Sequence, residues 1–174
     1  MPIKYTGKGY ITPPERQELS LEEFYLHFVE AFPDSDTREK LFSGYFKYIS
    51  DFQNEIVEDF TQWIGGSFSS KKLNPRDIDL VTILPFETFE TKSELIEKKF
   101  RKSAKSVYGV DAYIVSSYPE EHQKYPLFHG NLVYWDNQFT KTRKNRAGKR
   151  FKRGLGQTHQ KYFSLLFQKM LSLY

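Results

Sequence analysis

Cysteine is absent from this 174-residue chain, which excludes disulfide cross-links and zinc–thiolate sites. No apolar run approaches the ~18–20 residues that a membrane-spanning helix requires, and residues 1–5 lack the apolar stretch of a secretory signal. We therefore expect a soluble, cytoplasmic protein with no membrane partner. The length fits a single domain, residues 1–174, whose core needs no covalent staples.

Acidic residues are missing from the last part of the chain, after Asp136. Residues 137–174 contain ten Lys or Arg and carry a net charge of +10. Residues 1–136 contain the other 16 Lys or Arg and all 22 Asp or Glu, so their net charge is −6. Eight of the cations fall between Lys141 and Arg153. Such a segment can neutralise the phosphates of nucleic acid or of a bound triphosphate, although a solvated loop has the same composition. The candidate nucleic-acid contacts are Lys149, Arg150, Lys152 and Arg153.

The N-terminal third predicts two helices behind an irregular arm. Residues 1–19 contain Lys8-Gly9 and Pro13-Pro14, which interrupt regular structure. Ser20-Leu21-Glu22-Glu23 is a capping-box pattern, and it should begin a helix that ends near residue 31. Apolar residues at spacings of three and four predict a longer helix over residues 36–59.

The rest of the chain predicts strands with helices between them. Apolar runs predict strands at residues 61–64, 78–84 and 110–116, and a fourth at 132–135. A lysine-rich amphipathic helix is expected over residues 92–107, a basic loop over 137–156 and a C-terminal helix over 157–174. This order predicts an α/β or α+β domain built around a small mixed sheet with flanking helices.

One segment combines glycines with paired carboxylates. Asp77 and Asp79 are two residues apart on an expected strand, so both side chains project from one face. Two neighbouring carboxylates repel unless a cation or proton lies between them, and Mg²⁺ is often held by one or two carboxylates and substrate phosphates. A third carboxylate is expected on a neighbouring strand, because two-metal phosphoryl transfer needs ligands from more than one side. Asp111, at the start of the next strand, is the best candidate.

Gly65-Gly66-Ser67 supplies the other half of this candidate site. Glycines allow the backbone to approach a phosphate closely, and successive amides in a tight turn bind anions. The Ser67 hydroxyl can donate to a phosphate oxygen, and Lys71 and Arg76 are nearby cations that could assist. The Walker A arrangement is missing. The alternatives are ordinary ones: loop-end and solvated aspartates, a turn residue at Asp111, a strand bulge at the glycines and loop charges at Lys71 and Arg76.

This pattern resembles the polymerase-beta-type nucleotidyltransferase superfamily, in which Gly–Gly/Ser precedes Asp–hydrophobic–Asp. Nine residues, Phe68 to Arg76, separate Ser67 from Asp77, which fits that signature. Within the superfamily, residues 10–136 look like a small bacterial and phage-associated group of nucleotidyltransferase-like proteins. That closer likeness depends on the central motif and on Pro13-Pro14, Ser20-Leu21-Glu22-Glu23-Phe24, Arg38 with Leu41-Phe42, and Tyr134-Trp135.

The resemblance implies a nucleotidyltransferase fold, with Gly66 and Ser67 at a nucleoside triphosphate and with Asp77, Asp79 and Asp111 as catalytic ligands of Mg²⁺ or Mn²⁺. The expected activity is transfer of a nucleoside monophosphate to a protein or RNA acceptor. Two alternatives stay open. One is a non-catalytic antitoxin or interaction protein with a cognate partner, as in toxin–antitoxin or phage-defence systems. The other is an RNA-binding module whose basic tail is the working part.

Overall fold

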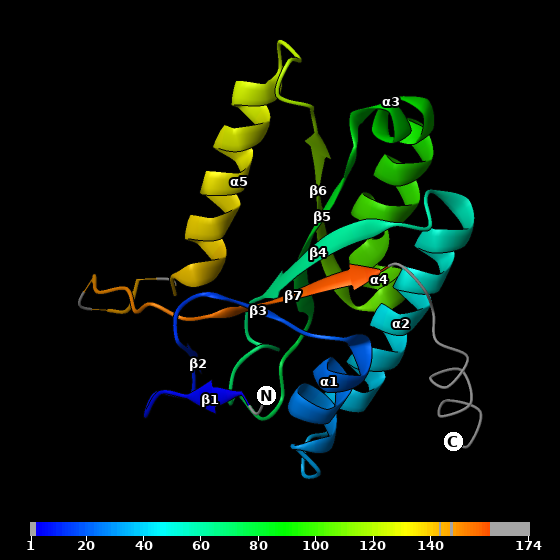
Figure 1. Ribbon diagram of the computed structural model, residues 1–174. Coiled ribbons are helices and arrows are strands. Elements are labelled where there is room, and N and C mark those ends of the chain that lie inside the picture. The colour runs from blue at the N-terminus through cyan, green and yellow to red at the C-terminus, as the bar shows by residue number, and fades with distance from the viewer. Residues whose placement is uncertain (1–2, 143, 147, 161–174) are drawn as a thin grey trace.

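A computed structural model describes residues 3–142, 144–146 and 148–160 (Figure 1). Its centre is a five-stranded mixed sheet in the order β3 (Arg16–Glu18), β7 (Leu155–Gln160), β4 (Phe60–Gly65), β5 (Ile78–Pro85) and β6 (Val110–Ser117). The pairs β3–β7 and β5–β6 are parallel, and β4 is antiparallel to both of its neighbours. The expected α+β class with a small mixed sheet and flanking helices is confirmed.

One face of the sheet is covered by the N-terminal helices and by the crossover between β5 and β6 (Figure 1). The first helix, α1 (Leu21–Tyr25), continues as a π-helical turn, η1 (Leu26–Glu30), and is followed by α2 (Arg38–Glu55). The crossover consists of α3 (Phe86–Leu95), η2 (Ile96–Lys102) and α4 (Ala104–Tyr108). The predicted capping box is present, since the Ser20 Oγ accepts from the Glu23 amide at 3.0 Å and the Ser20 amide donates to the Glu23 carboxylate at 2.9 Å. The core on this face is mainly aromatic, with fully buried Phe24, Phe42, Tyr45 and Phe52.

The opposite face is covered by one helix, α5 (Tyr125–Thr140), which Figure 1 shows standing apart from the others. The predicted fourth strand at residues 132–135 is therefore wrong, because these residues lie inside α5. The physical reason is the packing of α5 on the sheet: Phe128, Leu132, Trp135 and Phe139 recur at spacings of three and four and contact the cluster of Trp63, Val81, Val115 and Leu155. The aromatic and β-branched residues in this stretch favour a strand locally, and tertiary packing overrides that preference.

Segments near both ends of the described chain, β3 and β7, belong to the central sheet. The predicted C-terminal helix is wrong over residues 157–160, which belong to β7, and its remainder, 161–174, lies outside the described residues. The expected irregular arm contains strands within its described residues, 3–19: β1 (Lys4–Tyr5) and β2 (Ile11–Thr12) form an antiparallel hairpin, and β3 pairs with β7. The strands β3 and β7 depend on partners far away in the sequence, which a local pattern does not reveal. Of the helices in the described ranges, none combines the length and the apolar character needed to cross a membrane.

Candidate nucleotide and metal site

The sheet register places Gly65, Asp79 and Asp111 side by side on three neighbouring strands. Asp79 on β5 is the partner of Gly65 on β4 and of Asp111 on β6. The residues that alternate with Asp79, Ile78 and Leu80, are buried in the core on the helical face. The carboxylates of Asp79 and Asp111 therefore lie on the α5 side of the sheet, at the end of β5 that Asp77 precedes.

The two adjacent glycines have separate structural roles. Gly66 has a positive φ of +72°, and a Cβ atom there would lie 1.6 Å from the Asp79 Oδ2 atom. A Cβ atom at Gly65 would lie 2.8 Å from the Phe139 ring. Gly66 thus admits the carboxylate and Gly65 admits α5, so neither position tolerates a side chain without movement.

A lysine that the sequence analysis did not single out lies between two of the carboxylates. The Lys105 ammonium on α4 is 2.7 Å from Asp77 Oδ2 and 3.7 Å from Asp111 Oδ2. The hydrogen bond to Asp77, and then its charge, raise the pKa of Lys105. In the described part of the chain, no group of three or more His, Cys, Asp or Glu side chains is arranged as a metal-ligand set. In this arrangement a side-chain cation, Lys105, neutralises the carboxylates.

The surroundings of Asp79 disfavour its ionised form. Burial raises its pKa, and the negative charges of Asp77 and Asp111 raise it further, while Arg153 and Lys105 act in the opposite direction. The ionised form of an aspartate that is disfavoured in this way is stabilised when a cation approaches. This electrostatic strain is a common property of functional sites, although structural ion clusters share it.

Buried Arg38 holds the loop between β4 and β5. Its five N–H donors meet five carbonyl groups: Nη1 donates to Phe28 (2.6 Å) and Phe68 (2.8 Å), Nη2 to Ser70 and Lys72 (both 2.7 Å) and Nε to Leu73 (3.3 Å). Burial lowers the pKa of Arg38 to about 10, so the guanidinium stays charged at neutral pH. Because the acceptors lie on this loop and on η1, Arg38 fixes the conformation of the residues that follow Ser67.

The N-terminal hairpin, residues 4–12, lies against the same loop. The Lys71 amide donates to the Gly9 carbonyl at 2.8 Å, and Tyr10 and Ser70 form an isolated antiparallel bridge. This contact fixes one wall of a cavity of about 1180 Å³ in front of the carboxylates. All seven residues predicted for catalysis and nucleotide binding line this cavity: Gly66, Ser67, Lys71, Arg76, Asp77, Asp79 and Asp111.

The four predicted nucleic-acid contacts do not form one set. Arg150 and Arg153 line the cavity, whereas Lys149 is exposed and Lys152 lines a separate cavity of about 420 Å³. Arg153 acts inside the site, because its Nε donates to the Phe139 carbonyl at 2.7 Å and its Nη1 to the Gly66 carbonyl at 3.1 Å. It ties the end of α5 to the glycine turn. Sequence reasoning missed this role, which arises only when β7 enters the sheet beside β4.

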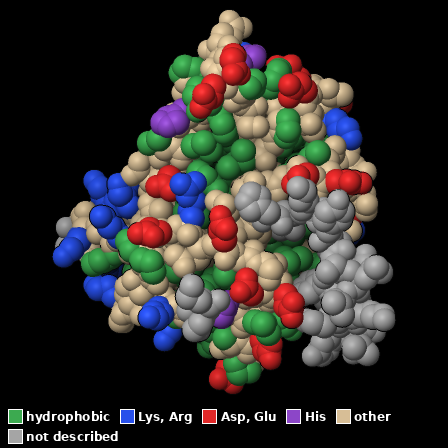
Figure 2. All heavy atoms as spheres, viewed as in Figure 1, with side chains coloured by type: hydrophobic (Ala, Val, Ile, Leu, Met, Phe, Trp, Pro, Cys, Tyr) green, Lys and Arg blue, Asp and Glu red, His purple; other side chains and the backbone are tan. Residues whose placement is uncertain are grey.

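The cavity wall carries more positive than negative charge. Among the described residues that line it, eight are cationic and three are anionic, the cations being Lys8, Lys71, Lys72, Arg76, Lys105, Lys141, Arg150 and Arg153. Figure 2 shows Lys and Arg side chains gathered on the side of the molecule where Figure 1 places the chain between α5 and β7. A row of carboxylates inside a cationic wall suits a ligand that brings both a divalent cation and several phosphates.

Fold and site together define an α+β protein with a row of aspartates beside a glycine turn, set in a cationic cavity. The chain belongs to DUF6932, a family of unknown function, whose sequence model matches residues 4–157. No curated protein and no solved structure matches the chain.

Proposed function

We propose that this protein is a metal-dependent nucleotidyltransferase that moves a nucleoside monophosphate from a nucleoside triphosphate to an acceptor hydroxyl. The observation that carries the proposal is the register of Asp79 and Asp111 on adjacent strands, with the Asp79 carboxylate in contact with Gly66. One cavity is thereby faced by the Gly66–Ser67 turn, which can approach phosphates, and by the pair of Asp79 and Asp111, which needs a cation.

The donor set fits Mg²⁺ or Mn²⁺. Asp77, Asp79 and Asp111 offer only carboxylate oxygens, which hard divalent cations prefer, and such ions need only one or two carboxylates when phosphates complete the shell. The Lys105 ammonium is a stand-in cation beside Asp77 and Asp111, so the position already attracts positive charge. Asp77 and Asp79 would hold the ion, and Asp111 would hold a second ion or act as the base.

The chain's own residues account for the steps of the reaction. The acceptor hydroxyl oxygen attacks the α-phosphorus, the bond from that phosphorus to the β-bridging oxygen breaks, and pyrophosphate leaves with the electron pair. Asp111 takes the hydroxyl proton. The amides of the Gly66–Ser67 turn and the Ser67 hydroxyl donate to phosphate oxygens, while Lys71 and Arg76 neutralise the leaving pyrophosphate. A bound divalent cation supplies charge neutralisation and lowers the pKa of the acceptor hydroxyl.

Mass spectrometry tests the proposal directly. The protein is incubated with each NTP, Mg²⁺ and either host lysate or host RNA, and a nucleoside monophosphate adduct is expected on one acceptor class. Asp79→Asn should abolish the adduct, whereas Gly130→Ala should not, since a Cβ atom at Gly130 meets nothing within 4 Å. The proposal fails if no NTP yields an adduct and if calorimetry detects no Asp79-dependent binding of Mn²⁺–NTP.

The ion pair of Lys105 favours a second candidate, a non-catalytic protein that keeps the pocket to bind a nucleotide or a cognate partner. In this form Lys105 neutralises the carboxylates permanently and no divalent cation enters. A titration with Mn²⁺ separates the two: saturable Mn²⁺ binding that depends on Asp77 supports the enzyme, and nucleotide binding indifferent to Mn²⁺ supports the binding protein.

A further inference from the structure

The described residues of the basic segment before β7 form a hairpin. We call the described residues between Lys141 and Arg153 the basic hairpin. Lys141 and Lys152 form an antiparallel bridge, and the Thr142 amide donates to the Phe151 carbonyl at 2.9 Å. Asn145 closes the turn, because its carbonyl accepts from Gly148 and its side chain from the Lys149 amide, each at 2.9 Å. The described part of the expected basic loop is therefore a hydrogen-bonded hairpin.

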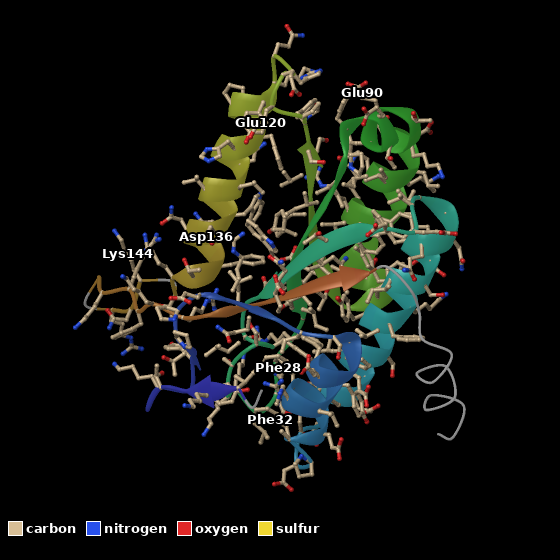
Figure 3. The ribbon with its side chains drawn as sticks, viewed as in Figure 1. Phe28, Phe32, Glu90, Glu120, Asp136 and Lys144 are labelled. Atoms are coloured by element: carbon tan, nitrogen blue, oxygen red, sulfur yellow. The ribbon has the colours of Figure 1, made fainter. Side chains whose placement is uncertain are left out.

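The cations of the basic hairpin divide into an outer and an inner group. Lys144, Arg146 and Lys149 are exposed, and Figure 3 shows Lys144 on the part of the hairpin that projects from the body. Lys141 and Arg150 line the cavity in front of the carboxylates. Positive charge thus extends from the projecting turn into the site, which is the arrangement that a chain of phosphates can follow.

Aromatic contacts fix the basic hairpin to the rest of the cavity wall. The Lys8 ammonium lies 3.7 Å from the centre of the Phe151 ring, and the Tyr10 ring stacks on Phe151 with centroids 6.5 Å apart. Phe151 therefore joins the basic hairpin to the N-terminal hairpin, so that the outer cations and the cavity keep one relative position.

An exposed aromatic ring lies at the same cavity. Tyr134 on α5 lines the cavity and is 54% exposed, although its neighbour Trp135 is packed on Tyr113 with ring centroids 4.3 Å apart. The Tyr134 ring meets Trp135 edge to face at 5.2 Å, which limits its rotation. A largely exposed, braced ring beside a cationic path is the combination that single-stranded nucleic acids use for stacking.

We propose that the acceptor is the end of a single-stranded polynucleotide, an assignment that depends on the proposed function for its chemistry. Its phosphates contact Lys144, Arg146 and Lys149, and its terminal nucleotide stacks on Tyr134. The terminal hydroxyl then faces Asp111 inside the cavity. The outer cations are exposed and do not line the cavity, whose own wall already holds eight cations for a triphosphate. This surplus of positive charge outside the cavity favours a polyanionic acceptor over a small neutral one.

The binding step is tested without nucleotide or metal, by fluorescence anisotropy with a labelled oligoribonucleotide, the DNA strand of the same sequence and a duplex. Tyr134→Ala should weaken single-strand binding roughly ten-fold, whereas Tyr134→Phe keeps the ring and should bind as the wild type does. The triple change of Lys144, Arg146 and Lys149 to Ser should lower the slope of log affinity against log salt by about two units, since single strands contribute about 0.7 per neutralised phosphate. The matched control, Lys98→Ser with Arg101→Ser and Lys102→Ser, removes the same charge from the surface of η2.

Three results overturn the proposal. They are no binding of single strands at low salt, equal loss from the η2 control, and tight binding of poly-glutamate or duplex that is unaffected by Tyr134→Ala. The last result assigns the surface to an acidic protein or a duplex instead. Single-strand binding as described, with no adduct in the mass-spectrometric assay and no Asp79-dependent binding of Mn²⁺–NTP, supports this surface and contradicts the proposed transfer reaction, so the two failures are distinguishable.

Discussion

Replacement of Gly66 by Ala should damage the site and the fold together. The positive φ of +72° costs a non-glycine residue about 1–2 kcal/mol. The added Cβ atom would lie 1.6 Å from Asp79 Oδ2 and 2.5 Å from Asp79 Cγ, so the carboxylate must move by about 2 Å to reach ordinary contact. We expect a loss of about 2–3 kcal/mol in the free energy of unfolding, from the backbone strain and the displaced side chain.

Urea unfolding followed by tryptophan fluorescence measures this cost, and calorimetry with Mn²⁺–NTP measures the loss of affinity, expected at ten-fold or more. Gly130→Ala is the control, because a Cβ atom there meets nothing within 4 Å and alanine should stabilise α5 by about 0.5–1 kcal/mol. In an Asp79→Ala background the Gly66 change should cost mainly its backbone strain, since the clashing carboxylate is gone and only the Cβ atom at position 79 remains close, at 3.0 Å. Strict additivity of the two changes, or wild-type affinity for Mn²⁺–NTP in Gly66→Ala, would refute the reasoning.

Three further changes test separate parts of the site. Burial and the neighbouring carboxylates raise the pKa of Asp79 above 3.8, so its ionisation destabilises the folded state at neutral pH. At neutral pH, Asp79→Asn should therefore be more stable than the wild type. The extra stability of Asp79→Asn should shrink as pH falls from the raised pKa to below 3.8, where the folded and the unfolded wild type both bind the proton. Extra stability that persists in acid would contradict the raised pKa of Asp79. Lys105→Met should raise Mn²⁺ affinity roughly two- to five-fold, the scale of an exposed ion pair, with Lys102→Met as control in the same titration. The lysine in Arg38→Lys cannot reach five carbonyls, so this change should lower the free energy of unfolding in urea by about 2–4 kcal/mol and weaken NTP binding. An NTP affinity equal to that of the wild type would show that the loop held by Arg38 does not bind the nucleotide.

Local patterns were sufficient for the part of the fold that holds the carboxylates. The capping box at Ser20, the apolar runs of β4, β5 and β6, and Gly109 after the crossover are all signals within a few residues of the element they define. Gly109 has a φ of +71°, the left-handed conformation that ends a helix and that glycine adopts easily. Because β5 and β6 are parallel neighbours, two strand predictions also placed Asp111 beside Asp79.

The elements that sequence reasoning missed are those that depend on distant partners. The strand β7 begins at Leu155 and pairs with β3 on one side and β4 on the other, so both of its partners are more than ninety residues away. Nothing in Leu155-Gly156-Gln157-Thr158 alternates clearly enough to identify a strand. The helix α5 does leave a signal, since Phe128, Leu132, Trp135 and Phe139 follow a helical period, but the run of strand-forming residues inside it gives a competing local pattern.

Lys105 could have been inferred from topology alone. In a parallel β–α–β unit the end of the crossover helix returns to the end of the sheet where both strands begin. Lys105 is in the short helix α4 directly before β6, and Asp77 directly precedes β5, so the crossover brings the two together whatever the intervening residues are. The ion pair of Lys105 with Asp77 is thus a consequence of the same strand order that aligns Asp79 with Asp111. If a metal uses these carboxylates, as proposed, it competes with a cation that the fold itself delivers to Asp77 and Asp111, so Lys105 should lower the affinity of the site for that metal.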